Sequence, residues 1–203
     1  MKITILPARK EQAPIIARMI MTAMDLDCCQ NFAGPHHTLD EFHRLMTGLV
    51  ERDDSQYSYR NTLVAQATVP EGLATEGNGK KTESLAGIIV GYDGRDLRRL
   101  RKAFIDAAKR ELGQDFTGML DETGPGEYYI DSLCVAQKYR HQGIASSLIK
   151  AFISRHGKEQ PVGLLVDKGN PKAEHLYSSL GFEYVDDTTW GGHEMKHLQF
   201  NKK

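Results

Sequence analysis

From Glu127 onwards, strand and helix patterns alternate along the chain, and this order limits the possible folds more than any other feature. Glu127–Val135 and Val162–Val166 each predict a strand, and a helix is expected between them over about Gly143–Arg155. A strand, a helix and a second strand of these lengths imply a parallel pair joined by a crossover helix, set in a mixed sheet. The pattern continues with an expected helix over Lys172–Leu180 and strands near Phe182–Val185 and Glu194–Phe200.

The N-terminal part predicts the rest of such a sheet. Ile3–Leu6 is typical of a short strand, and apolar residues at three- and four-residue spacing predict an amphipathic helix over Gln12–Leu26. A second helix is expected after Thr38, because Thr38 and Glu41 can form a capping box. Two further strands are expected over Asn61–Val69 and Leu85–Tyr92, joined by a mobile hairpin loop, PEGLATEGNGKKTES.

An extra helix is predicted near residues 94–113. Asp93 is a suitable N-cap and Gly113 a suitable terminator, and apolar residues between them follow one helical stripe. The other face is basic, as on surfaces that bind nucleic acid, but acidic residues dilute its charge. We therefore expect a solvated face, with nucleic-acid binding the less favoured interpretation. The basic residues are Arg95, Arg98, Arg99, Arg101, Lys102, Lys109 and Arg110.

Composition and charge place the chain among ordinary soluble proteins. Its 203 residues suit one domain spanning residues 1–203, and the net charge of −1 gives no general attraction to nucleic acid or anionic membranes. No apolar run approaches the roughly 18 residues of a membrane span, and MKITILPARK holds too short an apolar run for a secretion signal. Cys28, Cys29 and Cys134 lack the spacing of a disulfide framework, so reduced thiols and a cytoplasmic location are expected.

The segment RHQGIA, residues 140–145, opens the helix expected after the Glu127–Val135 strand. Gly143 and Ala145 leave little side chain there, so a ligand can approach the backbone closely. The first helical turn has unpaired N–H groups and a positive dipole end, and Arg140 can add a charged contact. These features suit a phosphate or pyrophosphate, although small residues at a helix start also serve packing alone. The glycine patterns of P-loops and dinucleotide-binding folds are absent here.

The order of strand, R-x-x-G-x-A, helix, strand and then NPKAEHLYSSLGF resembles the GNAT-type N-acetyltransferase superfamily. The resemblance is close over Glu127–Phe182 and looser over the rest of the chain. It implies an α/β (α+β mixed) fold with a central mixed sheet of about six to seven strands flanked by helices. The family usually joins two of these strands by a short turn, so the extra helix near residues 94–113 looks like an insertion. This insertion could cover the acceptor pocket or form a subunit contact.

The resemblance implies acetyl-CoA as co-substrate and no metal. Arg140–Ala145 would hold the pyrophosphate, and the backbone of Leu133–Val135 would pair with the pantetheine arm like an added strand. Asn170 would face that arm, and Tyr177 would lie near the thioester sulfur. The expected cofactor-binding residues are Leu133, Cys134, Val135, Arg140, His141, Gln142, Gly143, Ile144, Ala145, Ser146, Asn170 and Tyr177.

The implied reaction is direct attack of an amine on the acetyl thioester, without a covalent enzyme intermediate. Tyr177 would protonate the departing thiolate, although a packing role beside Phe182 is the alternative. The N–H of Val135 is the expected oxyanion donor.

Asp131 and Glu127 are the two candidates for the base. Alternation along a strand would put Glu127, Asp131 and Val135 on one face, so both carboxylates would look along the same groove. Either could relay the proton, or both could be solvated carboxylates at a strand end.

The sequence HEMKH, residues 193–197, matches the zinc-peptidase pattern H-E-x-x-H by coincidence. That site needs a helix, in which the two histidines lie about 6 Å apart along the axis, whereas a strand would separate them by about 13 Å. We expect a strand, and no third ligand follows His197. The histidines His36, His37 and His43 are expected in a solvated or substrate-lining region, where His37 or Phe32 could contact substrate.

Two functions therefore compete. One is an acetyl-CoA-dependent N-acetyltransferase acting on a primary amine, and the other is a non-catalytic acyl-CoA-binding or sensing module with the same fold. The acceptor could be a small polyamine, an aminoglycoside-like compound, an amino acid or a protein N-terminus. The expected partners are a small-molecule or peptide amine, with a second copy of the chain as a further option; no membrane is expected.

Overall fold

A mixed β-sheet forms the centre of the protein in the computed structural model, which describes residues 2–68 and 83–201. Its seven strands lie in the order β1-β2-β3-β4-β5-β7-β6. The strands are β1 Lys2–Pro7, β2 Thr62–Thr68, β3 Glu83–Asp93, β4 Tyr128–Val135, β5 Val162–Asp167, β6 Glu183–Trp190 and β7 His193–Phe200.

The pairing confirms the mixed sheet and the parallel pair predicted from the sequence. Strands β4 and β5 are parallel, whereas each of the other described neighbours is antiparallel. Most of the hairpin loop predicted between β2 and β3 lies outside the described residues. The helices are α1 Ala13–Met24, α2 Leu26–Ala33, α3 Leu39–Glu51, α4 Leu97–Leu112, α5 Ile144–His156 and α6 Pro171–Ser179.

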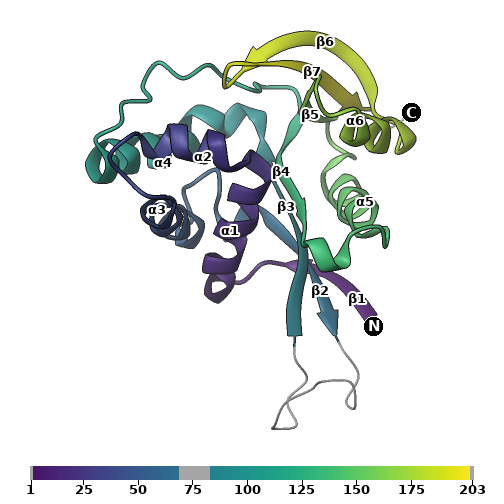
Figure 1. The fold of residues 1–203 in the computed structure, drawn as a ribbon. Helices are drawn as coiled ribbons and strands as arrows, with labels where there is room; N and C mark the ends of the chain where they lie inside the picture. The colour runs from purple at the N-terminus through teal and green to yellow at the C-terminus, as the bar shows by residue number, and fades with distance from the viewer. Residues whose placement is uncertain (1, 69–82, 202–203) are drawn as a thin grey trace, which may run out of the picture.

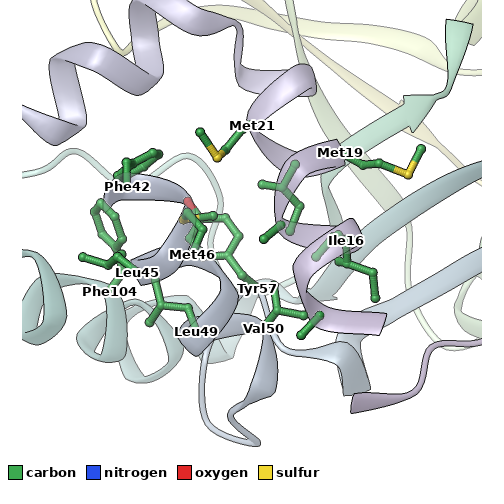
Figure 2. Close-up of a cluster of buried hydrophobic side chains, with 14 of the residues drawn as sticks. Ile16, Met19, Met21, Phe42, Leu45, Met46, Leu49, Val50, Tyr57 and Phe104 are labelled. Carbon is green, nitrogen blue, oxygen red and sulfur yellow. The ribbon is translucent and has the colours of Figure 1, made fainter. Parts of the chain in front are cut away.

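Helices cover both faces of the sheet. Helices α1 to α4 gather on one face, and α5 and α6 lie on the other (Figure 1). On the first face, Ile16 of α1, Phe42 and Leu49 of α3, and Phe104 of α4 are buried in one apolar cluster (Figure 2). A second cluster on the opposite face centres on Leu148 and other residues of α5. Full burial of each large apolar side chain contributes about 1.5–3 kcal/mol, so the two clusters hold the layers together.

The helix predicted over Gln12–Leu26 is α1, and α2 is a further helix that was not predicted. Helix α1 ends at Met24, and Asp25 takes a positive φ of 68° that turns the chain. The Asp25 side chain then accepts a hydrogen bond from the Cys28 N–H at 2.8 Å and caps α2. This backbone region is rare for residues other than glycine, and aspartate is a good N-cap. The capping box of Thr38 and Glu41 is present at the start of α3.

The predicted extra helix is α4, and its basic side chains are largely neutralised. Exposed ion pairs link Arg95–Asp93, Arg98–Asp121, Arg99–Asp96, Lys102–Asp106, Lys109–Asp115 and Arg110–Glu111. Each exposed pair contributes little to stability, but together they leave no uniform basic surface.

Arg101 differs from the other basic residues of α4 because it is only 3% exposed. Its guanidinium donates to the Leu120 carbonyl at 2.9 Å and forms ion pairs with Asp121 and Glu122. Glu122 is itself buried, at 8% exposed. Arg101 thus fixes the loop between α4 and β4 against the helix.

Candidate functional site

The parallel pair β4–β5 comes apart half-way along its length. Tyr128–Ile130 pair with Val162–Leu164, but the residues beyond them do not pair. A cavity of about 1190 Å³ opens in this gap and is lined on its two sides by Ser132–Val135 and Leu165–Asp167. The separation exposes one edge of β4 in the interior of the sheet.

Hydrogen bonding shows which backbone groups face the gap. The Ala136 N–H donates to the Ala86 carbonyl of the neighbouring segment at 2.9 Å. Antiparallel bonds alternate along a strand, so Cys134 also bonds toward β3, whereas Leu133 and Val135 direct their N–H and C=O groups into the gap. The Val135 carbonyl accepts from Arg140 Nε at 3.2 Å. An extended amide chain could therefore pair with β4 here.

A β-bulge at Asp131 changes the alternation of side chains along β4 from the one expected from the sequence. Val90 pairs with Ser132 and Gly91 with Ile130, so Asp131 is an extra residue on β4. The extra residue reverses the alternation of side chains beyond it. Leu133 and Val135 consequently pack toward the α5 face, whereas Tyr129 packs with α4. The expectation that Glu127, Asp131 and Val135 share one face was wrong.

One end of the cavity is built by the start of α5. His141 and Gly143 have positive φ angles of 61° and 74°, and Gly143 is the N-cap of the helix. Such left-handed residues turn successive N–H groups toward one point, where they can bind an anion. The cavity lining here comprises Arg140, His141, Gly143, Ile144, Ala145 and Ser146. Gln142 is not part of this lining.

Helix α6 contributes the wall opposite β4. Asn170 lines the cavity and caps α6 by accepting from the Ala173 N–H at 3.1 Å. Tyr177 also lines the cavity, and its ring lies 5.8 Å from that of Phe182, so it packs against the core as well. Burial raises the pKa of Tyr177 to about 12, which keeps the phenol protonated at neutral pH.

Asp131 lines the other end of the cavity among neutral donors. It accepts hydrogen bonds from Ser132 Oγ at 2.9 Å, Tyr92 Oη at 3.1 Å and Gln56 Nε2 at 3.2 Å. Burial raises the pKa of Asp131, and these hydrogen bonds only partly offset the effect. No cation forms an ion pair with Asp131 within the described ranges 2–68 and 83–201.

The Tyr92 hydroxyl links Asp131 to the buried pair of Arg101 and Glu122. It lies 3.0 Å from Glu122 Oε1 and 3.1 Å from Asp131 Oδ2, and it donates its single proton to one of them at a time. Glu122 also lines the cavity. The inserted helix α4 thus supports this end of the cavity through Arg101.

Glu127, the second carboxylate predicted from the sequence, does not line the cavity. The Glu127 side chain lies over Gly163 of β5, and a Cβ atom at position 163 would collide with the Glu127 carboxylate. His197 Nε2 lies 2.9 Å from Glu127 Oε2, and Gln199 donates to the same oxygen at 2.7 Å. Thr123 donates to Oε1 at 2.6 Å. These contacts occupy both oxygens, so Glu127 joins the start of β4 to β7.

The HEMKH segment is a strand, as the sequence predicted. It begins β7, with His193 Nδ1 2.9 Å from Asp167 Oδ2 and His197 paired with Glu127. In the part of the chain that the structure describes, no group of three or more metal-ligating side chains is found. His37 and Phe32 were expected as candidate substrate contacts. His37 does not line the cavity, and Phe32 lines a smaller adjoining cavity.

Several cavity residues escaped the sequence analysis. They come from the α1–α2 turn, the loop after α3 and the hairpin between β6 and β7. These segments lie outside the motifs that carry the family resemblance and reach the cavity only in the folded protein. The nearest expectation from the sequence was a solvated or substrate-lining region around His36, His37 and His43. The missed cavity residues are Thr22, Ala23, Met24, Asp25, Cys28, Tyr57, Trp190, Gly191 and His193.

The separated strands and the anion-binding helix start agree with a family match. Residues 39–182 match the family model described as the acetyltransferase (GNAT) family. The chain belongs to the GNAT acetyltransferase family. Members of this family use acetyl-CoA. No curated protein sequence matches the chain.

Solved structures of acetyltransferases share the fold over nearly the whole chain. One, described as an acetyltransferase, is 28% identical, with a TM-score of 0.72 over 98% of this chain and 100% of that chain. An N-acetyltransferase from Staphylococcus aureus Mu50 is 23% identical, with a TM-score of 0.75 over 97% of this chain and 99% of that chain. The NatC complex bound to Gag peptide and CoA is 18% identical, with a TM-score of 0.54 over 100% of both chains.

Among the described residues, no helix is both long and apolar enough to cross a membrane.

We expect the Glu127–His197 pair to make stability depend on pH. Hydrogen bonding to Glu127 raises the pKa of His197 in the folded protein. The contribution of His197 to folding stability is therefore complete below about pH 6.5 and is lost as pH rises through this raised pKa. Burial alone would raise the pKa of Glu127, but hydrogen bonds from His197, Thr123 and Gln199 lower it. The Glu127 contribution is therefore present above about pH 4.3 and is lost as pH falls through the folded value.

The measurement is the difference in melting temperature between wild type and His197→Gln. It should be largest between about pH 5 and 6 and should shrink toward about pH 8.5. A difference that stays constant across this range would show that the pair does not titrate as described.

Proposed function

We propose that the protein is an N-acetyltransferase that transfers the acetyl group of acetyl-CoA to a primary amine by direct attack in a ternary complex. The observation that carries this proposal is one continuous cavity. It joins the anion-binding start of α5, the open edge of β4 and the partly buried carboxyl of Asp131. These features match, in order, the phosphates of the coenzyme, its amide-containing arm and the attacking amine.

The residues present fit acetyl-CoA, which supplies the acetyl group as an activated thioester. The N–H groups at the start of α5, with Arg140, would bind the pyrophosphate. The gap-facing N–H and C=O groups of Leu133, with the C=O of Val135, would pair with the amides of the pantetheine arm, and Asn170 faces the same space from α6.

Three groups would then carry the chemistry. Asp131 accepts a proton from the substrate ammonium, and its raised pKa makes it a stronger base than an ordinary carboxylate. The amine nitrogen bonds to the thioester carbon, while the Val135 N–H stabilises the charge on the acetyl oxygen. The carbon–sulfur bond breaks and Tyr177 donates its phenolic proton to the thiolate, while the second proton lost from the attacking nitrogen restores the Tyr177 phenol.

The cysteines support direct attack over an acetylated enzyme thiol. Cys28 and Cys134 line the cavity, and the structure shows both as free thiols. Burial, with a smaller effect of Asp25, raises the pKa of Cys28 to about 11, and burial also raises that of Cys134. Both thiols therefore remain protonated at neutral pH, and a protonated thiol is a poor nucleophile.

We expect Asp131→Asn and Tyr177→Phe each to lower kcat/KM for the amine by about 10²–10⁴-fold, the usual contribution of general acid–base catalysis. Thiol release from acetyl-CoA measures the rate, and calorimetry should give an unchanged acetyl-CoA Kd. The acid limb of the wild-type pH profile reports ionisation of Asp131 and should vanish in Asp131→Asn.

Glu127→Gln is the matched control for the carboxylate assignment. It should keep turnover within a few-fold of wild type, because Glu127 lies outside the cavity lining. Loss of turnover in Glu127→Gln with normal turnover in Asp131→Asn would reverse the assignment. Tight acetyl-CoA binding without acetylation of any amine would favour the non-catalytic binding module.

We expect Gly143→Ala to weaken acetyl-CoA binding about 5- to 30-fold. A left-handed conformation costs an alanine about 1–2 kcal/mol, so the loop would relax and binding would have to restore it. No atom crowds a Cβ at Gly143, so the effect would come from the backbone alone.

Gly113→Ala is the matched control for Gly143→Ala. Gly113 also has a positive φ, of 65°, and open space, but it ends α4. It should lower the melting temperature and leave the acetyl-CoA Kd unchanged. Equal acetyl-CoA affinities in the two variants would contradict the proposal that residues 140–143 bind the phosphates.

A further inference from the structure

A second, smaller cavity adjoins the acceptor end of the main one. Its volume is about 350 Å³, and it shares Trp190 and Gly191 with the main cavity. Its other walls come from α2 and from the loop that follows α4. They comprise Phe32, Asp115, Phe116, Gly118, Met119 and Leu120.

The walls of this side cavity are apolar. Asp115 is its one charged residue, and it is engaged with Lys109 at 3.6 Å and with the Thr117 hydroxyl at 2.7 Å. The remaining lining is aromatic, aliphatic or glycine. With Asp115 already engaged, the apolar remainder of the walls favours an uncharged, apolar group over a cationic one.

The aromatic walls are held in place by the core. The Phe116 ring stacks on buried Phe104 at 5.4 Å and meets the edge of Phe32 at 5.2 Å, and Trp190 lies 6.4 Å from Phe32. Phe32 and Phe116 also pack against the main apolar cluster. The cavity is therefore preformed, which lowers the entropy cost of binding a rigid ring.

Two polar groups near the junction of the two cavities have hydrogen-bonding or charge requirements that the described residues do not meet. The Trp190 Nε1 atom is buried and has no hydrogen-bond partner among the described residues. On the main-cavity side, Asp131 has only neutral donors, whereas Glu122 is balanced by Arg101.

We infer that the acceptor is a primary monoamine bearing an apolar, preferably aromatic, group. This inference rests on the proposed function, because it places the ammonium at Asp131 and the apolar group in the side cavity. A cavity of about 150 Å³ can bind benzene, so about 350 Å³ accepts an aromatic ring with its alkyl linker. Polyamines and aminoglycoside-like compounds do not fit, because their further charges would face the apolar walls.

The experiment compares three amines with the full-length enzyme and acetyl-CoA: 2-phenylethylamine, ethylamine and spermidine. We expect kcat/KM for 2-phenylethylamine to exceed that for ethylamine at least about tenfold, since even one methylene in an apolar pocket gives such a factor. Spermidine should be no better than ethylamine. Equal or higher kcat/KM for ethylamine or spermidine would overturn the inference and leave the proposed function intact.

Two variants test whether the side cavity causes the preference. Phe116→Ala removes a wall, and Leu120→Asp adds a carboxylate where the native side chain is 64% exposed, so folding is preserved. Both should abolish the advantage of 2-phenylethylamine over ethylamine. Leu26→Asp is the matched control, because Leu26 is 62% exposed and lines neither cavity, and it should keep the preference.

A binding measurement distinguishes failure of the side-cavity inference from failure of the proposed function. With CoA bound, 2-phenylethylamine should raise the melting temperature of wild type and Leu26→Asp, but not of Leu120→Asp. An absent or variant-independent shift would overturn the side-cavity inference. Failure of acetyl-CoA itself to bind, with no amine acetylated, would instead overturn the proposed function.

Discussion

The separation of β4 from β5 beyond Ile130 and Leu164 is the constraint on which the site depends. Parallel pairing up to that point fixes the two strands, and its loss opens a cavity inside the sheet instead of at a loop surface. The bulge at Asp131 lies at the same place. It directs Asp131 away from the face of Leu133 and Val135, while the backbone of these two residues remains exposed to the gap.

The inserted helix α4 gives the acceptor end its chemical character. Buried Arg101 holds the following loop through Leu120, Asp121 and Glu122, and Tyr92 connects Glu122 to Asp131. The same loop continues into the apolar side cavity through Phe116 and Met119. One insertion thus supports both Asp131, the carboxyl proposed to accept the ammonium, and the apolar wall beside it.

Local patterns in the sequence predicted the regular elements well, because apolar periodicity and capping residues act over a few positions. Thr38 with Glu41, Gly113 and the R-x-x-G-x-A segment all lie where they were expected. The bulge could not be predicted, because one extra residue at Asp131 depends on pairing with β3. Nor could the role of Trp190 or Glu122 be predicted, since both reach the cavity only through tertiary packing. Glu127 begins the predicted strand, yet its partners His197 and Gln199 lie 70 and 72 residues later in the chain.

Residue-resolved amide hydrogen exchange along β4, with and without CoA, tests the central claim most directly. Cys134 bonds toward β3 and should exchange slowly in both states. Leu133 and Val135 face the gap and should exchange rapidly in the free protein and slowly when CoA is bound, because only a paired amide is protected. If saturating CoA leaves the exchange of Leu133 and Val135 unchanged, then the gap between β4 and β5 is not where the coenzyme binds.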